Sequence, residues 1–261
     1  MGTRFRALIL AAPLALAACG HSDRLVTRDL TYRSGGRTVE AYLVHRAGTA
    51  AARPGVVVVH GSGGDREELL GRAKQLARRG AVVVVPTMPS STMQGARPTS
   101  VRQLLEQSRV AQDADVAAVE RAGDLLRAQP GVQRLGYLGW SAGAKTGALV
   151  AAADPRFAAL ALLSAGAEPM GAFAAAAPPG TQAEVRRMLT PIDPIHALAR
   201  ARPGTVLLED GTRDEIVPRR ALENVIRAAP PRTTLRWYDT PHALSDRAYA
   251  DAIDWLYARL Q

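Results

Sequence analysis

Ser141 stands in the pattern Gly-Trp-Ser-Ala-Gly at positions 139–143, where a serine lies between two glycines. A short apolar segment at 134–138 precedes it and an alanine-rich segment follows, so we expect a strand, a sharp turn and a helix. The glycines leave room for strained backbone angles that expose the hydroxyl. The start of the helix directs N–H groups at negative charge developing on a substrate. This context favours a nucleophilic serine for acyl transfer over a structural turn.

A second glycine-rich segment, His-Gly-Ser-Gly-Gly at 60–64, follows an apolar run at 55–59. A bend at this point can direct a backbone N–H at the same substrate oxygen that the N–H of Ala142 reaches. We therefore predict an oxyanion hole formed by the N–H groups of Ser62 and Ala142. A phosphate-binding loop is disfavoured because the G-x-x-x-x-G-K pattern is absent.

The segment 209–215 is expected to supply an acidic partner for a histidine. Its four carboxylates are Glu209, Asp210, Asp214 and Glu215. Asp214 is favoured, because it falls in a turn beyond the end of an expected strand and just before a Val-Pro pair that begins the next helix. Asp210 stays open as the alternative, and its structural interpretation is capping of the turn at Gly211.

His242 follows the last expected strand and precedes the last expected helix. The order Ser141, Asp214, His242 is one of the chain orders in which catalytic triads occur. The other histidines fit less well, because they lie in the N-terminal segment, a hairpin, the glycine-rich bend and a segment rich in Ala, Pro and Gly. They are His21, His45, His60 and His196. His242 is therefore the predicted general base.

The elements that must carry these residues alternate between strands and helices. Continuous β-branched runs at 55–59 and 81–85 are typical of strands buried on both faces of a parallel sheet. Residues 27–33 and 38–46 flank a Ser-Gly-Gly-Arg turn, as in an antiparallel hairpin. Further strands are expected at 134–138, 158–163, 205–209 and 233–238, and helices at 66–79, 100–128, from 142, at 219–228 and at 246–260. The pattern predicts a single-domain α/β fold with a mostly parallel, doubly wound sheet and an antiparallel N-terminal hairpin.

Residues 164–204 interrupt this alternation with a segment rich in Ala, Pro and Gly, in which only 184–189 has a weak helical pattern. Such an insertion lies above the carboxyl ends of parallel strands, where ligands bind in sheets of this kind. We expect it to act as a small cap over a substrate pocket. Met88, Met170 and Phe173 are the expected lining residues, which favours an apolar acyl group.

The N-terminus carries two arginines, an uncharged apolar run at 7–18 and then Cys19, the one cysteine of the chain. Residues 1–18 have the pattern of a secretion signal peptide. The end of the run, Leu-Ala-Ala-Cys, resembles a bacterial lipobox, which implies cleavage before Cys19 and lipidation of its thiol. We therefore expect a lipidated tether at 19–26 and a folded domain at 27–261, exported and anchored to the cell envelope, at the periplasmic face of the outer membrane or the cell surface.

The chain of 261 residues carries a formal charge of +9, from 33 basic and 24 acidic residues. Its arginines are spread singly and form no basic run, so a compositional bias is favoured and no nucleic-acid partner is expected. With 47% apolar and 22% charged residues, the composition is that of a globular protein. The sequence has no His, Cys and carboxylate cluster with metal-ligand spacing. Neither a metal nor an organic cofactor is therefore expected.

Four motifs over about 27–260 together resemble the α/β-hydrolases, and within them the small dienelactone-hydrolase-like and esterase group. They are His-Gly-Ser at 60–62, Gly-Trp-Ser-Ala-Gly at 139–143, the loop from Gly211 through Asp214 to Pro218, and His242. Dienelactone hydrolases themselves carry cysteine at the position of Ser141, so a dienelactone is not the expected substrate. The resemblance implies hydrolysis of a small-molecule carboxylic ester through an acyl-enzyme on Ser141.

The same residues leave other functions open. A serine peptidase, an acyltransferase or a haloperoxidase would use the same three side chains. A non-catalytic envelope lipoprotein on a decayed hydrolase scaffold is disfavoured, because all three residues are present in order. A basic module that binds membranes or nucleic acid would show an affinity that falls steeply with salt.

Overall fold

The computed structural model describes residues 24–48 and 52–261, so the expected signal peptide and Cys19 lie outside the described residues. The strands are β1 (Leu25–Ser34), β2 (Arg37–Arg46), β3 (Arg53–Val59), β4 (Val82–Pro86), β5 (Val132–Trp140), β6 (Phe157–Leu163), β7 (Val206–Gly211) and β8 (Thr234–Tyr238). The helices are α1 (Leu70–Arg78), α2 (Pro89–Thr92), α3 (Val101–Arg127), α4 (Ala142–Ala153), α5 (Met170–Ala175), α6 (Gln182–Leu189), α7 (Pro194–Leu198), α8 (Arg219–Ala228) and α9 (Asp246–Leu260), with a 3-10 helix η1 (Thr190–Ile192). Within the described ranges, no helix combines the length and the apolar character needed to cross a bilayer.

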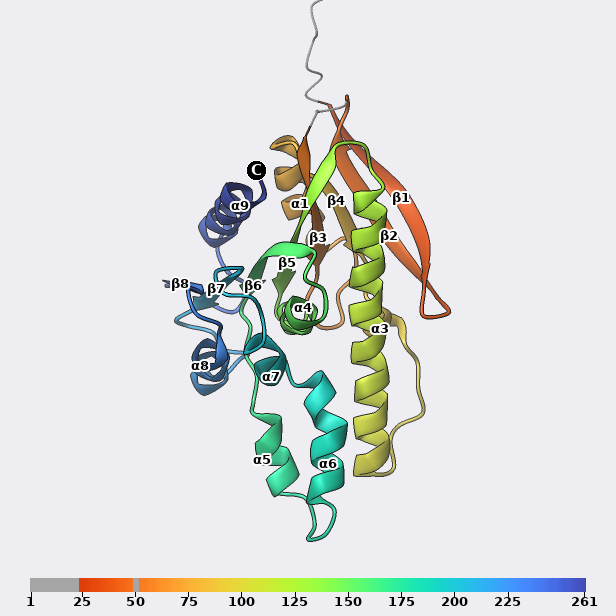
Figure 1. Ribbon diagram of the computed structural model, residues 1–261, viewed down its shortest axis with the longest axis vertical. Coiled ribbons are helices and arrows are strands. Elements are labelled where there is room, and N and C mark those ends of the chain that lie inside the picture. Colours follow the sequence, from red (N-terminus) through yellow and green to blue (C-terminus); the bar gives the residue numbers. More distant parts are fainter. Residues whose placement is uncertain (1–23, 49–51) are drawn as a thin grey trace, which may run out of the picture.

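The strands form one eight-stranded sheet in the order β1-β2-β4-β3-β5-β6-β7-β8 (Figure 1). β1 pairs with β2, and β2 with β4, in antiparallel register, whereas β3 and the strands beyond it pair in parallel. The β1–β2 hairpin closes on Gly35 and Gly36, both with positive φ, as a tight two-residue turn requires. The α/β-hydrolase fold with an antiparallel N-terminal hairpin, expected from the sequence, is confirmed.

The continuous valine run of β3 explains why this strand lies in the middle of the sheet. Val57 and Val59 belong to the core beneath α3 and α4, whereas Val56 and Val58 belong to the core beneath α1 and α9. Successive side chains of a strand point to opposite faces, so a strand covered on both faces must be apolar throughout. Figure 1 shows α3 and α9 on opposite sides of the sheet.

The insertion between β6 and β7 contains more helix than its sequence pattern indicates. The expected weak helix at 184–189 is the larger part of α6, and α5, η1 and α7 surround it. The helix α7 begins on an Asp-Pro pair, in which the Asp193 carboxylate accepts the N–H groups of Ile195 and His196. An acidic N-cap residue followed by proline indicates in the sequence where a helix begins. Hydrophobic periodicity alone does not detect a helix as short as α7. Helix α1 also begins later than expected, at Leu70 rather than 66.

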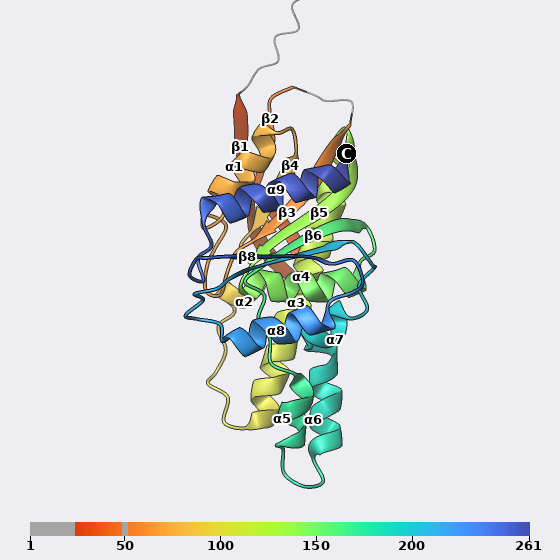
Figure 2. The ribbon, with the colours of Figure 1, turned by 90° about the vertical axis from the view of Figure 1, so that its left-hand side faces the viewer.

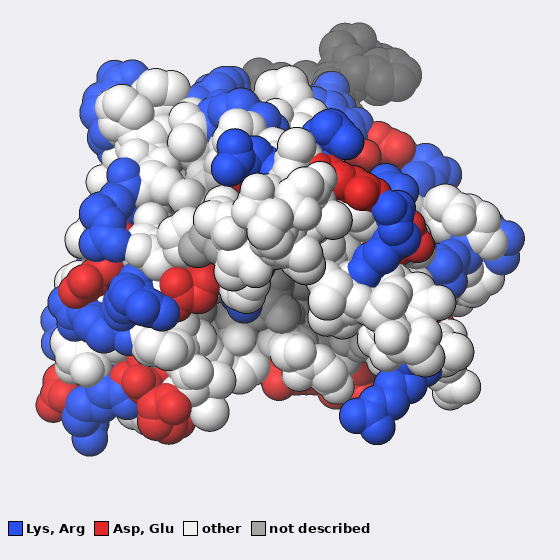
Figure 3. All heavy atoms as spheres, turned by 90° about the horizontal axis from the view of Figure 1, so that it is seen from below, with Lys and Arg blue, Asp and Glu red and all other residues white. Residues whose placement is uncertain are grey.

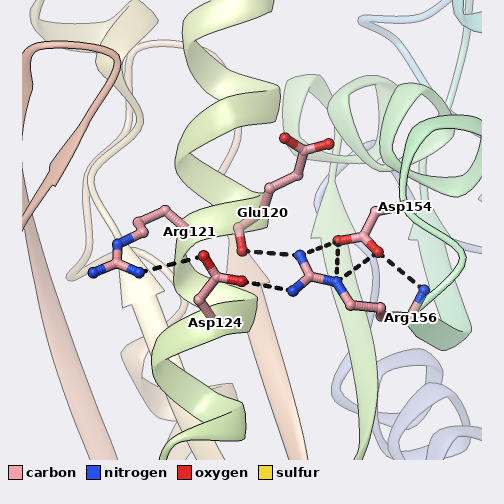
Figure 4. A network of polar contacts seen from close by, with 5 residues as sticks. All are labelled: Glu120, Arg121, Asp124, Asp154 and Arg156. Atoms are coloured by element: carbon pink, nitrogen blue, oxygen red, sulfur yellow. Dashed lines mark hydrogen bonds and ion pairs between the residues drawn. The ribbon is translucent and has the colours of Figure 1, made fainter.

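An ion-pair network anchors α3 against the turn between α4 and β6 (Figure 4). The guanidinium of Arg156 binds both carboxylate oxygens of the buried Asp154 and donates to Asp124 on α3 at 2.6 Å. Arg121 reaches the other oxygen of Asp124 from the same helix at 3.3 Å. The network thus holds α3 near its C-terminal end. The N-terminal half of α3 projects with α5 and α6 beyond the sheet (Figures 1 and 2).

Candidate active site

Ser141 lies in a strained turn between β5 and α4, with φ of 55° and ψ of −113°. Non-glycine residues rarely adopt such angles, and the surroundings must hold them in place. A Cβ atom at Gly139 would lie 2.5 Å from the carbonyl oxygen of Gly143, and one at Gly143 would lie 2.4 Å from that of Val59. Both glycines of the motif are thus required by close backbone approach.

His242 lies between Ser141 and Asp214. Its Nε2 is 2.9 Å from Ser141 Oγ, and its Nδ1 is 2.7 Å from Asp214 Oδ2. The other oxygen of Asp214 accepts the N–H groups of Ile216 and Val217, at 2.9 and 2.8 Å. The carboxylate is therefore fixed by its own loop, with Oδ2 directed at the imidazole. The structure brings the three sequence-predicted residues into one hydrogen-bonded chain.

The remaining carboxylates of the 209–215 segment do not bond to the imidazole of His242. Glu209 is buried and forms an ion pair with Arg236 at 2.9 Å, while Glu215 accepts the backbone N–H of His242 at 3.1 Å. Asp210 is also buried, and burial raises its pKa to about 7. Between the two candidates left open by the sequence, Asp214 is thus the one that contacts His242.

The loop that carries His242 is held by side chains that the sequence reasoning did not single out. The backbone carbonyl oxygen of His242 accepts hydrogen bonds from Trp140 Nε1 and from Ser164 Oγ, both at 3.0 Å. Ser164 directly follows β6 and has a positive φ of 54°. Trp140 belongs to the serine motif itself, and its position beside the nucleophile was the one available signal of such a role.

His60 shapes the glycine-rich loop after β3. Its Nδ1 donates to the carbonyl oxygen of Gly61 at 2.7 Å, because its Nε2 accepts the N–H of Met88 at 2.9 Å. The N–H of Gly61 is bound by the Glu68 carboxylate at 2.8 Å. His60 is therefore neutral with one defined tautomer, and it connects this loop to the segment after β4.

Ser62 and Ala142 line the same cavity of about 320 Å³ at the N-terminus of α4. The cavity is bounded by the glycine-rich loop, by the start of α4, and by residues of α2 and α3. Its polar lining includes Ser90 and Asp115, whose carboxylate accepts the N–H of Ser90 at 2.9 Å. Burial raises the pKa of Asp115 above its ordinary value. The two predicted oxyanion residues thus face one polar pocket.

The three residues expected to line the substrate pocket lie in two different cavities. Met88 is buried and lines the polar cavity with Ser62 and Ala142. Met170 and Phe173 line a separate apolar groove between α3 and the insertion. In the described part of the chain, no group of three or more His, Cys, Asp or Glu side chains is arranged to hold a metal ion.

Residues 39–253 match the model of the dienelactone hydrolase family. This chain belongs to the dienelactone hydrolase family. As a member of that family it is a hydrolase of the α/β type, although it has serine in the motif at 139–143. No curated protein matches the chain.

Solved structures with the same fold include several esterases. A cold-adapted esterase from an Arctic intertidal metagenomic library is 20% identical, with a TM-score of 0.65 over 91% of this chain and 95% of its own. The acetyl xylan esterase from Paenibacillus sp. R4 is 15% identical, with a TM-score of 0.71 over 95% and 87%. Acetyl xylan esterase 1 from a Thermoanaerobacterium species is 14% identical, with a TM-score of 0.70 over 91% and 88%. At these identities the similarity shows the shared fold.

Proposed function

We propose that this chain is a serine hydrolase that cleaves carboxylic esters, with Ser141 as nucleophile, His242 as general base and Asp214 as its acidic partner. One observation carries the proposal: hydrogen bonds run from Ser141 Oγ through both ring nitrogens of His242 to Asp214 Oδ2. The family, and the esterases among proteins of the same fold, support ester hydrolysis over peptide hydrolysis or acyl transfer to another acceptor.

In the first half of the reaction, Asp214 accepts a hydrogen bond from the Nδ1–H of His242, which keeps the proton on Nδ1 and leaves the Nε2 lone pair facing Ser141. His242 takes the hydroxyl proton as Ser141 Oγ attacks the ester carbonyl carbon. The oxyanion that forms accepts hydrogen bonds from the N–H groups of Ala142 and Ser62, each worth about 3 kcal/mol. The intermediate then collapses, and the leaving alcohol takes the proton from His242.

In the second half, water replaces the alcohol. His242 takes a proton from the water as it attacks the acyl carbon on Ser141, and the same N–H groups stabilise the second oxyanion. Collapse releases a carboxylic acid and restores the serine hydroxyl. No metal or organic cofactor takes part in these steps.

Labelling with a fluorophosphonate, followed by mapping of the labelled peptide, tests this proposal. We expect the label on Ser141, and we expect Ser141→Ala to abolish both labelling and ester hydrolysis. Ser34→Ala is a matched control, since Ser34 lies at the end of β1, in the N-terminal hairpin, and lines neither the oxyanion cavity nor the groove. Unchanged hydrolysis by Ser141→Ala would refute the proposed mechanism.

We also propose that the protein is exported and lipid-anchored through Cys19. Support comes from the charged, apolar and small-residue pattern of residues 1–19. Strand β1 begins at the end of the molecule opposite α5 and α6 (Figures 1 and 2), so an anchor before it leaves the projecting end free. Incorporation of labelled palmitate and sedimentation with membranes are expected for the full chain and lost in Cys19→Ala.

A further inference from the structure

An apolar groove of about 690 Å³ runs between the N-terminal half of α3 and the insertion helices α5 and α6. Ligand sites for small molecules are cavities of roughly 300–1,000 Å³, mostly apolar with a few polar groups. The groove fits that description. Its apolar walls include Leu104, Leu105, Met170, Phe173, Val185 and Met188.

Large apolar side chains that are exposed to solvent gather along the groove. Val101, Leu104 and Phe173 are 67%, 50% and 56% exposed, and they make up half of the large hydrophobic side chains exposed in the described part of the chain. Single exposed hydrophobic residues are ordinary, but a cluster that lines a hollow indicates a binding surface. Seen from the projecting end, mostly uncharged side chains surround a central hollow (Figure 3).

The two walls of the groove are joined at their rim. Arg102 on α3 forms an ion pair with Glu184 on α6, and both residues line the groove. The Arg156 network of Figure 4 fixes α3 further along its length. The walls therefore have defined positions, as a binding site requires.

One face of α3 connects the groove to the candidate active site. Leu104, Ser108 and Gln112 line the groove, and Asp115 lines the cavity that contains Ser62 and Ala142. These positions are three or four residues apart, so they lie on the same side of the helix. Gln112 and Asp115 are separated by about 5 Å along the axis, and the groove extends about 16 Å further to Val101.

The change in polarity along this face matches an amphiphilic ligand. The outer part is apolar, whereas Gln112 at the inner end carries a polar amide. Beyond it lies the polar cavity with the predicted oxyanion residues. A ligand with a long hydrocarbon chain and an ester group at one end would satisfy both parts.

The sheet order indicates which half of an ester lies on the α3 side. α3 follows β4, on one side of the nucleophile strand β5, whereas His242 follows β8 on the other side. His242 must protonate the leaving alcohol, so the alcohol lies toward β8. The acyl half is then directed toward α3.

We propose that the α3–α5–α6 groove binds the acyl chain of long-chain carboxylic esters and presents their carbonyl carbon to Ser141. This inference rests on the proposed ester hydrolysis, and it adds the substrate class. The occupant is a long fatty acyl chain, since the groove extends about 16 Å along α3 from Gln112 to Val101.

A chain-length series tests the inference. We expect kcat/KM for p-nitrophenyl esters to rise from acetate through butyrate to octanoate and dodecanoate, by about tenfold or more overall. Methyl dodecanoate and dodecyl acetate then distinguish the two halves of the ester. Preference for methyl dodecanoate supports the acyl assignment, and preference for dodecyl acetate overturns it.

The double variant Leu104→Gln/Phe173→Gln tests the groove directly. It is expected to lower kcat/KM for dodecanoate about tenfold and leave acetate nearly unchanged. Val110→Gln is the matched control, because Val110 is 42% exposed on the same helix but does not line the groove. Val185→Trp, which fills the groove, should shift the preference to shorter esters.

Four further results would overturn the inference. Active enzyme with no preference for long chains, or equal effects of the double variant and Val110→Gln, would remove the groove as an acyl site while leaving the proposed function intact. A changed mass in light scattering of the double variant, with an unchanged chain-length profile, would make the groove an interface between copies. Absence of hydrolysis of every ester by the unaltered protein would refute the proposed function, and this inference with it.

Discussion

Asp214 directs one carboxylate oxygen at Nδ1 of His242, at 2.7 Å, while two backbone N–H groups of its own loop hold the other oxygen. This arrangement fixes both the position of the imidazole and the nitrogen that carries its proton. Asp210, four residues earlier, is buried nearby without contacting His242 through any described bond. The two aspartates therefore have separable roles.

Replacing Asp214 with asparagine is expected to lower kcat by roughly a thousandfold or more, because an amide no longer stabilises the imidazolium or selects its tautomer. Steady-state hydrolysis of p-nitrophenyl acetate measures the loss. Asp210→Asn is the matched variant and should retain most of the activity. Equal losses in both variants would contradict the role given to Asp214.

Asp210 is expected to make the stability of the fold dependent on pH. Burial raises its pKa from 3.8 to about 7, so the folded state favours the protonated form. The free energy of unfolding therefore falls as pH rises from about 4 through 7, and the contribution is lost above that range. Asp210→Asn should raise the unfolding free energy at pH 8 by on the order of 3 kcal/mol and leave it unchanged near pH 4. Urea unfolding at both pH values measures this.

A control for that experiment is needed because burial also raises the pKa of Glu209 to about 7. Glu209 is paired with Arg236, so Glu209→Gln removes a titrating group and an ion pair together. Because the pKa of Glu209 is raised despite this ion pair, the same linkage applies, and Glu209→Gln should also make the unfolding free energy fall less between pH 4 and 8. A decrease in stability at pH 8 in Asp210→Asn would show that the ionised carboxylate is stabilising.

Gly143→Ala is expected to destabilise the protein by about 3 kcal/mol or more, because the added Cβ meets the carbonyl oxygen of Val59 at 2.4 Å. The resulting shift of the turn should also abolish labelling of Ser141. Gly71→Ala on α1 is the control, since nothing lies within 4 Å of its added Cβ, and it should stabilise by about 0.5–1 kcal/mol. Chemical unfolding compares the two, and similar stabilities would contradict the packing argument.

Arg156→Leu is expected to lower the unfolding free energy by about 3 kcal/mol, because it leaves the buried Asp154 carboxylate without its bidentate partner. Arg121→Leu removes a half-exposed contact to Asp124 and should cost less than about 1 kcal/mol. Thermal unfolding distinguishes the variants. If the two losses are equal, the network in Figure 4 does not act as an anchor for α3.

Arg156 also affects the response of the fold to acid. The hydrogen bond from Arg156 lowers the pKa of Asp124. Ionised Asp124 therefore stabilises the folded state at pH values above the ordinary carboxyl pKa, and this stabilisation is lost as pH falls. Because Asp124 is partly exposed, the effect is screened and small. Stability profiles between pH 6 and 2 should be slightly less steep in Arg156→Leu.

Local patterns in the chain determined the strands, the serine turn and the order of the three candidate residues. Residues 139–143 and the valine runs carry this information in their own spacing, because a buried strand must be apolar throughout and a tight turn needs glycine. The sequence also indicated that the insertion at 164–204 lies at the end of the sheet where ligands bind.

Only the tertiary structure decided which carboxylate contacts His242 and where the apolar residues gather. Asp210 and Asp214 lie in one short segment, and the packing of the His242 loop against Trp140 and Ser164 selects between them. Met88 and Phe173 fall in different cavities because α3 is 27 residues long, and one part of its face lines the polar pocket while its N-terminal half lines the apolar groove. Contacts between segments far apart in the chain depend on how helices are oriented, which local periodicity does not encode.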